Sequence, residues 1–265
     1  MPPSLDPSDD DHALARDLAG QAGRLLVSLR SRLVAEGATA GDLKSEGDRQ
    51  SHEYLLDRLS SARPADAVLS EEGSGGAAGT GRQGTARLEA DRVWIIDPLD
   101  GTREYGEPPR GDWAVHVALV SDGRPVAGAV ALPASRQVLG TIPAAPLPPA
   151  PPTRPRLVVS RTRPPAVAVH LAEAIGGDLV AMGSAGAKAA AVVLGAADVY
   201  AHSGGQYEWD SCAPVAVALA AGLVATRLDG SPLTYNNPDP YLPDLLICHP
   251  AIAHQVRTIL DDFVG

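Results

Sequence analysis

The chain has few cysteines and no long apolar run, and each scarcity excludes a class of protein. Only Cys212 and Cys248 occur among 265 residues, and neither lies in a Cys-x-x-Cys or Cys/His metal pattern. A chain of this length can bury a core without a disulfide, so we expect reduced thiols and a cytoplasmic location. The longest apolar stretch, about 212–225, contains Pro214 and Gly222 and is shorter than the roughly 20 residues that span a bilayer. We therefore expect a buried helix there and no membrane partner.

Basic residues are also scarce, because 22 Lys and Arg stand against 32 Asp and Glu, giving a net charge of -10. A surface of this sign repels a phosphate backbone, so we expect no nucleic-acid polymer as a partner. Residues 1–12 are rich in Pro and Asp where a secretory signal carries Lys or Arg, which predicts no export. With 45% hydrophobic and 20% charged residues, the composition is that of a globular chain of one or two domains.

The first half of the chain is predicted to form two helices and a sheet. Apolar residues from Leu14 to Leu33 recur every three or four positions, which predicts one long helix, and 48–60 has the same spacing. Short strands at 67–69 and 93–96 flank a Gly-rich loop, 73–91, which has the length of a lid over a site. Three β-type runs with turns between them then predict an antiparallel meander: 113–120, 125–132 and 137–142.

The second half alternates strands and helices. Seven prolines between Pro143 and Pro155 stiffen the chain as a linker does. We therefore predict an α+β domain at 1–153 and an α/β domain at 154–265, which together make an α/β protein. The expected strands are 157–159, 179–182, 198–201, 224–227 and 245–248, and the expected helices are 166–175, 187–194, one opening at Asp210, and 251–263.

Two aspartates at the end of an apolar strand are the first sign of chemistry. Asp97 and Asp100 lie three residues apart, and Pro98 fixes a backbone torsion so that both carboxylates can converge. Gly101 and Thr102 add room for a phosphate and a hydroxyl, and this set of hard oxygen ligands suits Mg²⁺ better than Zn²⁺. Taken alone, the segment could equally be a turn without chemistry.

Carboxylates also lie at two other element boundaries. Glu71 and Glu72 follow a short apolar strand, where solvent exposure is the simpler interpretation because neighbouring like charges repel. Asp210 precedes an apolar helical run, where it would by default be an N-cap that accepts backbone hydrogen bonds. Taken together, these carboxylates are stronger evidence for a functional site than any one of them alone. Each lies at the boundary of a helix or strand, and the segment of Asp97 and Asp100 also has room for a phosphate.

Four segments, taken in order, resemble the inositol monophosphatase and fructose-bisphosphatase superfamily of Mg²⁺-dependent, lithium-sensitive phosphatases. They are SEEG at 70–73, WIIDPLDGT at 94–102, GSAGAK at 183–188 and EWDSCAP at 208–214. The continuation REY, followed by DWAV at 112–115, is similar to the 3'(2'),5'-bisphosphate nucleotidase branch. The resemblance covers nearly the whole chain and implies a layered α/β/α/β/α sandwich with metals in a cleft between two domains.

The resemblance also implies the metal ligands. Glu71, Asp97 and the Leu99 carbonyl would bind a first Mg²⁺. Asp97, Asp100 and Asp210 would bind a second, so that Asp97 bridges the two. A third, weaker Mg²⁺ is possible beside these.

Catalytic and substrate-binding roles follow from the same resemblance. Asp48, Glu71 and Thr102 would be catalytic: Asp48 and Glu71 would hold the third metal, and Asp48 with Thr102 would orient the attacking water. Glu72 would support Glu71. The implied substrate-binding residues are Glu71, Leu99, Asp100, Gly101, Thr102, Ser184, Lys188 and Asp210, with Lys188 facing a 5'-phosphate or, alternatively, lying exposed at a helix start.

The implied reaction is hydrolysis of 3'-phosphoadenosine 5'-phosphate to AMP and phosphate, in sulfate assimilation. Attack by water needs no covalent phosphoenzyme. Hydrolysis of inositol or fructose phosphates is an alternative, because the metal site is indifferent to the leaving group, and a non-catalytic metabolite-binding regulator is an alternative of another class. Relatives suggest a homodimer. His116, on a β-type run, is expected to belong to the core and not to the catalytic set.

Overall fold

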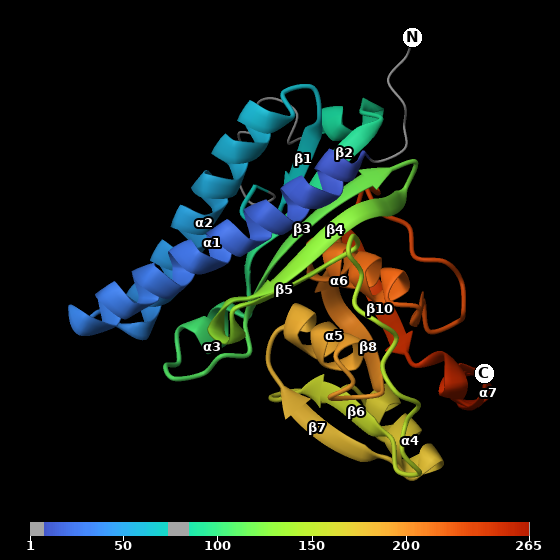
Figure 1. Cartoon of the computed structure of the whole chain (residues 1–265). Coiled ribbons are helices and arrows are strands. Elements are labelled where there is room, and N and C mark those ends of the chain that lie inside the picture. Colours follow the sequence, from blue (N-terminus) through green and yellow to red (C-terminus); the bar gives the residue numbers. More distant parts are fainter. Residues whose placement is uncertain (1–7, 74–84, 265) are drawn as a thin grey trace.

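Two five-stranded sheets organise the part of the chain that the computed structural model describes, residues 8–73 and 85–264. The strands of the first sheet lie in the order β1-β2-β3-β4-β5, and those of the second in the order β7-β6-β8-β10-β9. Helices α1 and α2 cover the first sheet on one side, α5 and α6 lie between the sheets, and α4 and α7 cover the second sheet (Figure 1). The predicted α/β/α/β/α sandwich is therefore confirmed.

Each element can be located along the chain by its bounds. The helices are α1 (Asp9–Ala35), α2 (Ala40–Ala62), α3 (Thr102–Tyr105), α4 (Ala166–Ile175), α5 (Ala185–Val193), α6 (Glu208–Ala220) and α7 (Pro250–Val264), with short 3-10 helices η1 (Thr85–Glu89) and η2 (Pro133–Ser135). The strands are β1 (Ala67–Ser70), β2 (Arg92–Asp100), β3 (Ala114–Ser121), β4 (Arg124–Leu132), β5 (Gln137–Gly140), β6 (Arg156–Ser160), β7 (Asp178–Met182), β8 (Val199–Tyr207), β9 (Val224–Thr226) and β10 (Tyr241–Cys248).

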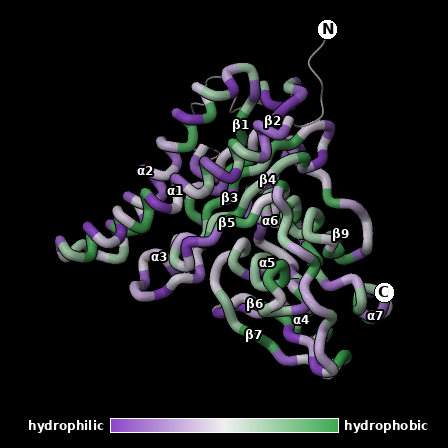
Figure 2. The backbone as a smooth tube through the Cα atoms, viewed as in Figure 1, coloured by the Kyte–Doolittle hydropathy of each residue, from purple (hydrophilic) through white to green (hydrophobic). Residues whose placement is uncertain are grey.

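The layers follow from the two-residue period of the strands, whose successive side chains point to opposite faces. In β3 the odd-numbered apolar residues pack on α1 and α2, and the even-numbered ones pack toward α5 and α6. The same alternation in β10 sends its side chains either to α6 or to the outer helices. Figure 2 shows the mixed colouring of α1 and α2, as expected of helices with one solvent-facing side.

Helix α2 begins earlier than predicted. The expected helix started at Asp48, but Thr39 is the N-cap of a helix that starts at Ala40. The Thr39 hydroxyl accepts a hydrogen bond from the Asp42 amide at 3.2 Å, and the Asp42 carboxylate accepts one from the Thr39 amide at 2.9 Å. This reciprocal cap stabilises a polar first turn that has little apolar periodicity, which is why the spacing of leucines did not reveal it.

Strand β8 is longer than the predicted 198–201 and carries the chain to the site. It continues to Tyr207, which pairs with Tyr241 on the antiparallel β10. Gly204 and Gly205 both have φ near +76°, a conformation open to glycine, and no apolar pattern marks this stretch. Because β8 ends at Tyr207, α6 starts directly at the carboxyl end of this strand.

The Gly-rich loop prediction for 73–91 is wrong for its last part. Residues 85–89 form η1, and Arg87 is 5% exposed. Its guanidinium donates to the Asn236 side-chain oxygen at 2.6 Å and to the Asn237 carbonyl at 2.7 Å. The rest of the suggested lid, residues 74–84, lies outside the described residues.

The predicted linker packs against the second half of the chain. Residues 143–155 contain no helix or strand, and the Pro148 carbonyl accepts a hydrogen bond from His249 Nε2 at 3.1 Å. The two halves also share one hydrophobic core, since residues of the first sheet, of α5 and α6 and of the second sheet form a single buried cluster. Within the described residues, no helix is both long and apolar enough to cross a bilayer.

Replacement of Arg87 by alanine should destabilise the protein. The change removes a buried guanidinium that donates to the Asn237 and Pro238 carbonyls at 2.7 and 3.4 Å. We expect the free energy of unfolding in urea to fall by about 2 to 4 kcal/mol. Arg124→Ala, at an exposed position without a side-chain bond among the described residues, is the matched control and should change it by less than about 0.5 kcal/mol. Equal effects of the two changes would contradict a stabilising role for the hydrogen bonds of Arg87.

Candidate active site

An irregularity in β2 brings Asp97 and Asp100 to the same side of the sheet. Residues three apart in a regular strand point to opposite faces. Here Asp97 pairs with His116 and Asp100 pairs with Ala114, so β2 advances by three residues where β3 advances by two. Because of this extra residue, the side chains of Asp97 and Asp100 point to the same face of the sheet, toward α5 and α6. The Asp97 carboxylate also accepts a hydrogen bond from the Leu99 amide at 3.1 Å.

Gly101 turns the chain at the end of β2. Its φ is +82°, and a Cβ at this position would lie 3.0 Å from the Ser184 Cβ and 3.2 Å from the Asp112 carbonyl oxygen. Both the backbone conformation and the crowding therefore require glycine. Gly101 is the N-cap of the short helix α3, whose first residue is Thr102.

Asp210 reaches the same place from α6. It is the third residue of the helix, and its carboxylate accepts a hydrogen bond from the amide of the N-cap residue, Tyr207, at 2.7 Å. The expected cap interaction is thus present, but Asp210 reaches back from N3 instead of occupying the N-cap position. Asp97, Asp100 and Asp210 each offer an oxygen atom within 4.8 Å of the others, so the structure brings these three predicted metal ligands together.

Thr102 and Asp48 lie beside this cluster. The Thr102 hydroxyl is 2.9 Å from the Leu99 carbonyl and 3.3 Å from the Asp48 carboxylate, both of which accept hydrogen bonds. Glu71, at the exit of β1, interacts with Asp97, and the charges of Asp100 and Asp210 act on it. The residues predicted to be catalytic therefore border the aspartate cluster.

Burial and mutual repulsion raise the pKa values of most of these carboxyl groups. Burial is the larger cause for Glu71 and Asp210, whose pKa values rise to about 7, and the neighbouring carboxylates add to it. The pKa of Asp97 lies well above its usual range for the same reasons. Burial and the charge of Glu72 likewise raise the pKa of Asp48 to about 7. Glu72 is exposed, and its charge adds to the rise in the pKa of Glu71; a supporting role for Glu72 stays a prediction.

Asp100 is the exception, because the start of α5 surrounds it with donors. The Ser184 hydroxyl donates to its Oδ2, as does the Gly186 amide at 2.6 Å, and the Ala185 amide donates to Oδ1 at 3.1 Å. Burial by itself would raise the pKa of Asp100, but His116, the Ser184 hydroxyl and the charge of Lys188 lower it to about 2. Ser184, predicted to contact substrate, thus binds the Asp100 carboxylate in this structure.

Lys188 is buried at the same helix start. It is 6% exposed, and its Nζ donates to the Ser184 carbonyl at 2.6 Å, so the alternative of an exposed lysine is wrong. Its ammonium group also lies 5.4 Å from the centre of the Tyr200 ring. Burial lowers the pKa of Lys188, while the charges of Asp100 and other acidic groups raise it in part. Contact with a 5'-phosphate stays a prediction.

His116 is a site residue whose role the sequence did not reveal. It is 1% exposed, as expected for a core residue, but its Nε2 lies 3.2 Å from Asp100 Oδ2. Burial lowers the pKa of His116, and the charge of Asp100 more than compensates, so the pKa is raised. The available sign was a single polar residue in the apolar run 114–120.

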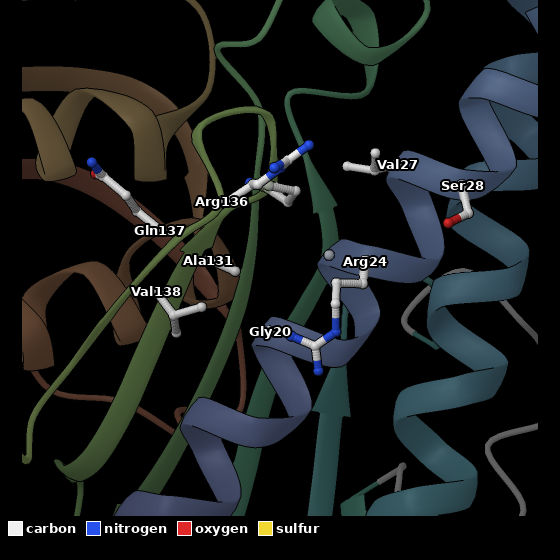
Figure 3. Close-up of a pocket in the computed structure, with 10 residues that line it drawn as sticks. Gly20, Arg24, Val27, Ser28, Ala131, Arg136, Gln137 and Val138 are labelled. Carbon is white, nitrogen blue, oxygen red and sulfur yellow. The ribbon is translucent and has the colours of Figure 1, made fainter.

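A groove lies on the other side of the first sheet. This groove of about 300 Å³ runs between α1 and β4–β5, with Arg24 and Arg136 beside apolar side chains (Figure 3). Its lining contains no acidic side chain. The aspartate cluster faces α5 and α6, so the groove on the α1 side is separate from it.

Comparison with known proteins shows that the chain belongs to the inositol monophosphatase family, whose model matches residues 9–144 and 156–261. A relative from Mycobacterium bovis, named 3'-phosphoadenosine 5'-phosphate phosphatase, is 50% identical over 240 residues, which are 88% of this chain and 86% of the relative.

Another relative and one solved structure extend the comparison. A Mycobacterium leprae protein of the same name is 48% identical over 255 residues, covering 92% of this chain and 90% of its own. Among solved structures, inositol monophosphatase-II from Staphylococcus aureus has the same fold, with a TM-score of 0.76 at 20% identity and 97% of each chain covered.

Stability of the metal-free protein should fall as the pH rises from about 4 to about 7. Over this range Glu71 and Asp210 hold protons in the folded chain, with pKa values of about 7, that they have lost in the unfolded chain. The folded state binds more protons, so the free energy of unfolding decreases by up to about 1.4 kcal/mol per pH unit for each such group. Urea unfolding in EDTA at a series of pH values measures this slope.

Two further arms of that experiment test its cause. Mg²⁺ should flatten the decrease, because a cation offsets the repulsion between the ionised carboxylates. Asp210→Asn should reduce the slope in EDTA, since it removes one of the shifted groups. A slope that is unchanged by both would contradict the assignment of the pH dependence to this cluster.

Proposed function

We propose that this protein is a Mg²⁺-dependent phosphatase that hydrolyses 3'-phosphoadenosine 5'-phosphate to AMP and phosphate. The observation that carries the phosphatase part is the convergence of Asp97, Asp100 and Asp210 beside Thr102. The substrate is supported by the names of the relatives that are about half identical over most of their length. A cytoplasmic location and a role in sulfate assimilation belong to this proposal, as do lithium sensitivity and a homodimer.

The donor set fits a hard divalent cation. All three clustered ligands are carboxylates, and no cysteine or histidine belongs to the group found among the described residues. Mg²⁺ prefers such oxygen ligands. Burial and the neighbouring carboxylates raise the pKa values of Asp97 and Asp210, so a cation at this place would favour their ionised forms. We assign a first ion to Glu71, Asp97 and the Leu99 carbonyl and a second to Asp97, Asp100 and Asp210, with a third, weaker site at Asp48 and Glu71.

The chain's own groups can position the phosphate and the water. When bound, divalent ions neutralise phosphoryl charge and make water more acidic. The amides of Gly101 and Thr102, at the start of α3, are the donors that we propose for the phosphate. The Thr102 hydroxyl lies 2.9 Å from the Leu99 carbonyl and 3.3 Å from Asp48, and its lone pairs can accept a hydrogen bond from water. As the water gives up a proton to this hydroxyl, the hydroxyl can pass its own proton to Asp48. Water is thus the nucleophile, and no side chain becomes phosphorylated.

A phosphate-release assay on a panel of substrates tests the proposed reaction. With Mg²⁺ present, 3'-phosphoadenosine 5'-phosphate should have a higher kcat/KM than inositol 1-phosphate or fructose 1,6-bisphosphate. Asp100→Asn and Asp210→Asn should each lower kcat/KM by about 10²-fold or more, because each removes a ligand charge. Asp122→Asn, at an exposed turn position with φ of +51°, is the matched control and should have no effect. A preference for inositol 1-phosphate would favour the alternative substrate class, and no release from any of them would favour a non-catalytic binder.

Thr102 offers a separate test of how water is oriented. Thr102→Val keeps the shape of the side chain and removes the hydroxyl that lies 3.3 Å from Asp48, so kcat should fall by about 10²- to 10⁴-fold. Thr102→Ser keeps the hydroxyl and should retain most of the rate. If the two variants lose activity equally, the hydroxyl has no role in the reaction and Thr102 acts through packing.

A further inference from the structure

We propose that His116 is a positioning residue of the metal site, which holds the Asp100 carboxylate at a fixed place relative to helix α6 and Asp210. The inference rests on the proposed metal site and adds to it a residue that provides no metal ligand. It is carried by the position of His116 in the sheet, by its two contacts and by the space that the chain keeps open for its ring.

The position of His116 in the sheet directs its ring toward the cluster. His116 lies opposite Asp97 in the β2–β3 register, and residues that pair in this way point to the same face. Ala114 and Ala118, two residues before and after it on that face, belong to the apolar core under α6. One large polar side chain therefore interrupts a row of small apolar ones, directly beside the proposed ligands.

The two ring nitrogens contact groups from different halves of the chain. Nδ1 lies 3.0 Å from the Trp209 carbonyl, which can only accept, so Nδ1 carries a hydrogen. Nε2 lies 3.2 Å from Asp100 Oδ2, which is an ion-pair contact, and it has no hydrogen-bond partner among the described residues. Because Trp209 immediately precedes Asp210, the ring spans from one proposed ligand to the backbone next to another.

The neighbouring helix leaves room for the ring. A Cβ at Gly186 would lie 2.0 Å from His116 Nε2, closer than any two such atoms can approach. The same Gly186 donates its amide to Asp100 at 2.6 Å. The His116 ring and the Gly186 amide thus both contact Asp100 Oδ2, and an apolar packing role explains neither contact. Ligands held in this way by neighbouring groups typically lose 10- to 100-fold in metal affinity when the supporting group is removed.

Melting temperature as a function of Mg²⁺ concentration tests the proposal without substrate. His116→Val should raise the Mg²⁺ concentration that gives the half-maximal increase in melting temperature by about tenfold or more. His116→Asn places an amide donor near the Trp209 carbonyl but does not reach Asp100, and it should show a smaller increase of the same kind. If His116→Val does not fold, the His116→Asn variant tests the proposal in its place.

A matched control separates positioning from packing. His249 is 6% exposed and bonds the Pro148 carbonyl through Nε2 at 3.1 Å, far along the chain from the cluster. His249→Asn should lower the melting temperature without changing the half-maximal Mg²⁺ concentration. If His116→Val behaves in the same way as this control, the proposal is overturned.

The phosphate-release assay gives a second readout. At low Mg²⁺ the His116 variants should have reduced kcat/KM, and excess Mg²⁺ should restore most of it, whereas a packing defect would persist. Two outcomes separate the proposed metal site from the role of His116. If the melting temperature of the unsubstituted protein does not depend on Mg²⁺, both the metal site and the role of His116 are overturned. If His116→Val has the same Mg²⁺ dependence as the unsubstituted protein, only the role of His116 is overturned.

Discussion

The repulsion between buried carboxylates is the constraint on which the rest of the site depends. Asp97, Asp100 and Asp210 are held within 4.8 Å of one another by a fold whose other interactions must offset the cost. Two extended apolar interfaces, between the first sheet and α6 and between α6 and the second sheet, provide that offset. The site is therefore a place where the chain gives up stability to create an affinity for positive charge.

The same segment also shows how local donors decide the state of a carboxyl group. Asp97 and Asp100 lie on one strand with similar burial, yet the pKa of Asp97 is raised and that of Asp100 is lowered to about 2. The difference lies in His116, whose Nε2 is 3.2 Å from Asp100, and in Ser184 and Lys188, which also lower the pKa of Asp100. Of the two, Asp100 is thus ionised and oriented before any ligand arrives, whereas Asp97 needs a cation to become so.

Sequence patterns predicted those parts of the fold that depend on short-range periodicity. The meander β3–β4–β5 and the long helix α1 follow from apolar spacing, and the segments around Asp97, Asp100 and Asp210 predicted three metal ligands whose carboxylates the structure brings together. The burial of Lys188 and the contact of His116 with Asp100 depend on how α5 packs on the first sheet, which no local pattern contains. The domain boundary at residue 153 is predicted from the proline-rich composition of the segment, and it stays a prediction.

The placement of α6 has a consequence for how the molecule comes apart. This helix packs on β4 with one side and contacts β10 with another, and residues on both sides of the proline-rich segment share its buried cluster. Neither half can expose its sheet to water without also uncovering the helix that serves the other. Heating should therefore melt both halves in one cooperative transition, and cutting the chain within the prolines would yield two pieces that are each only half covered.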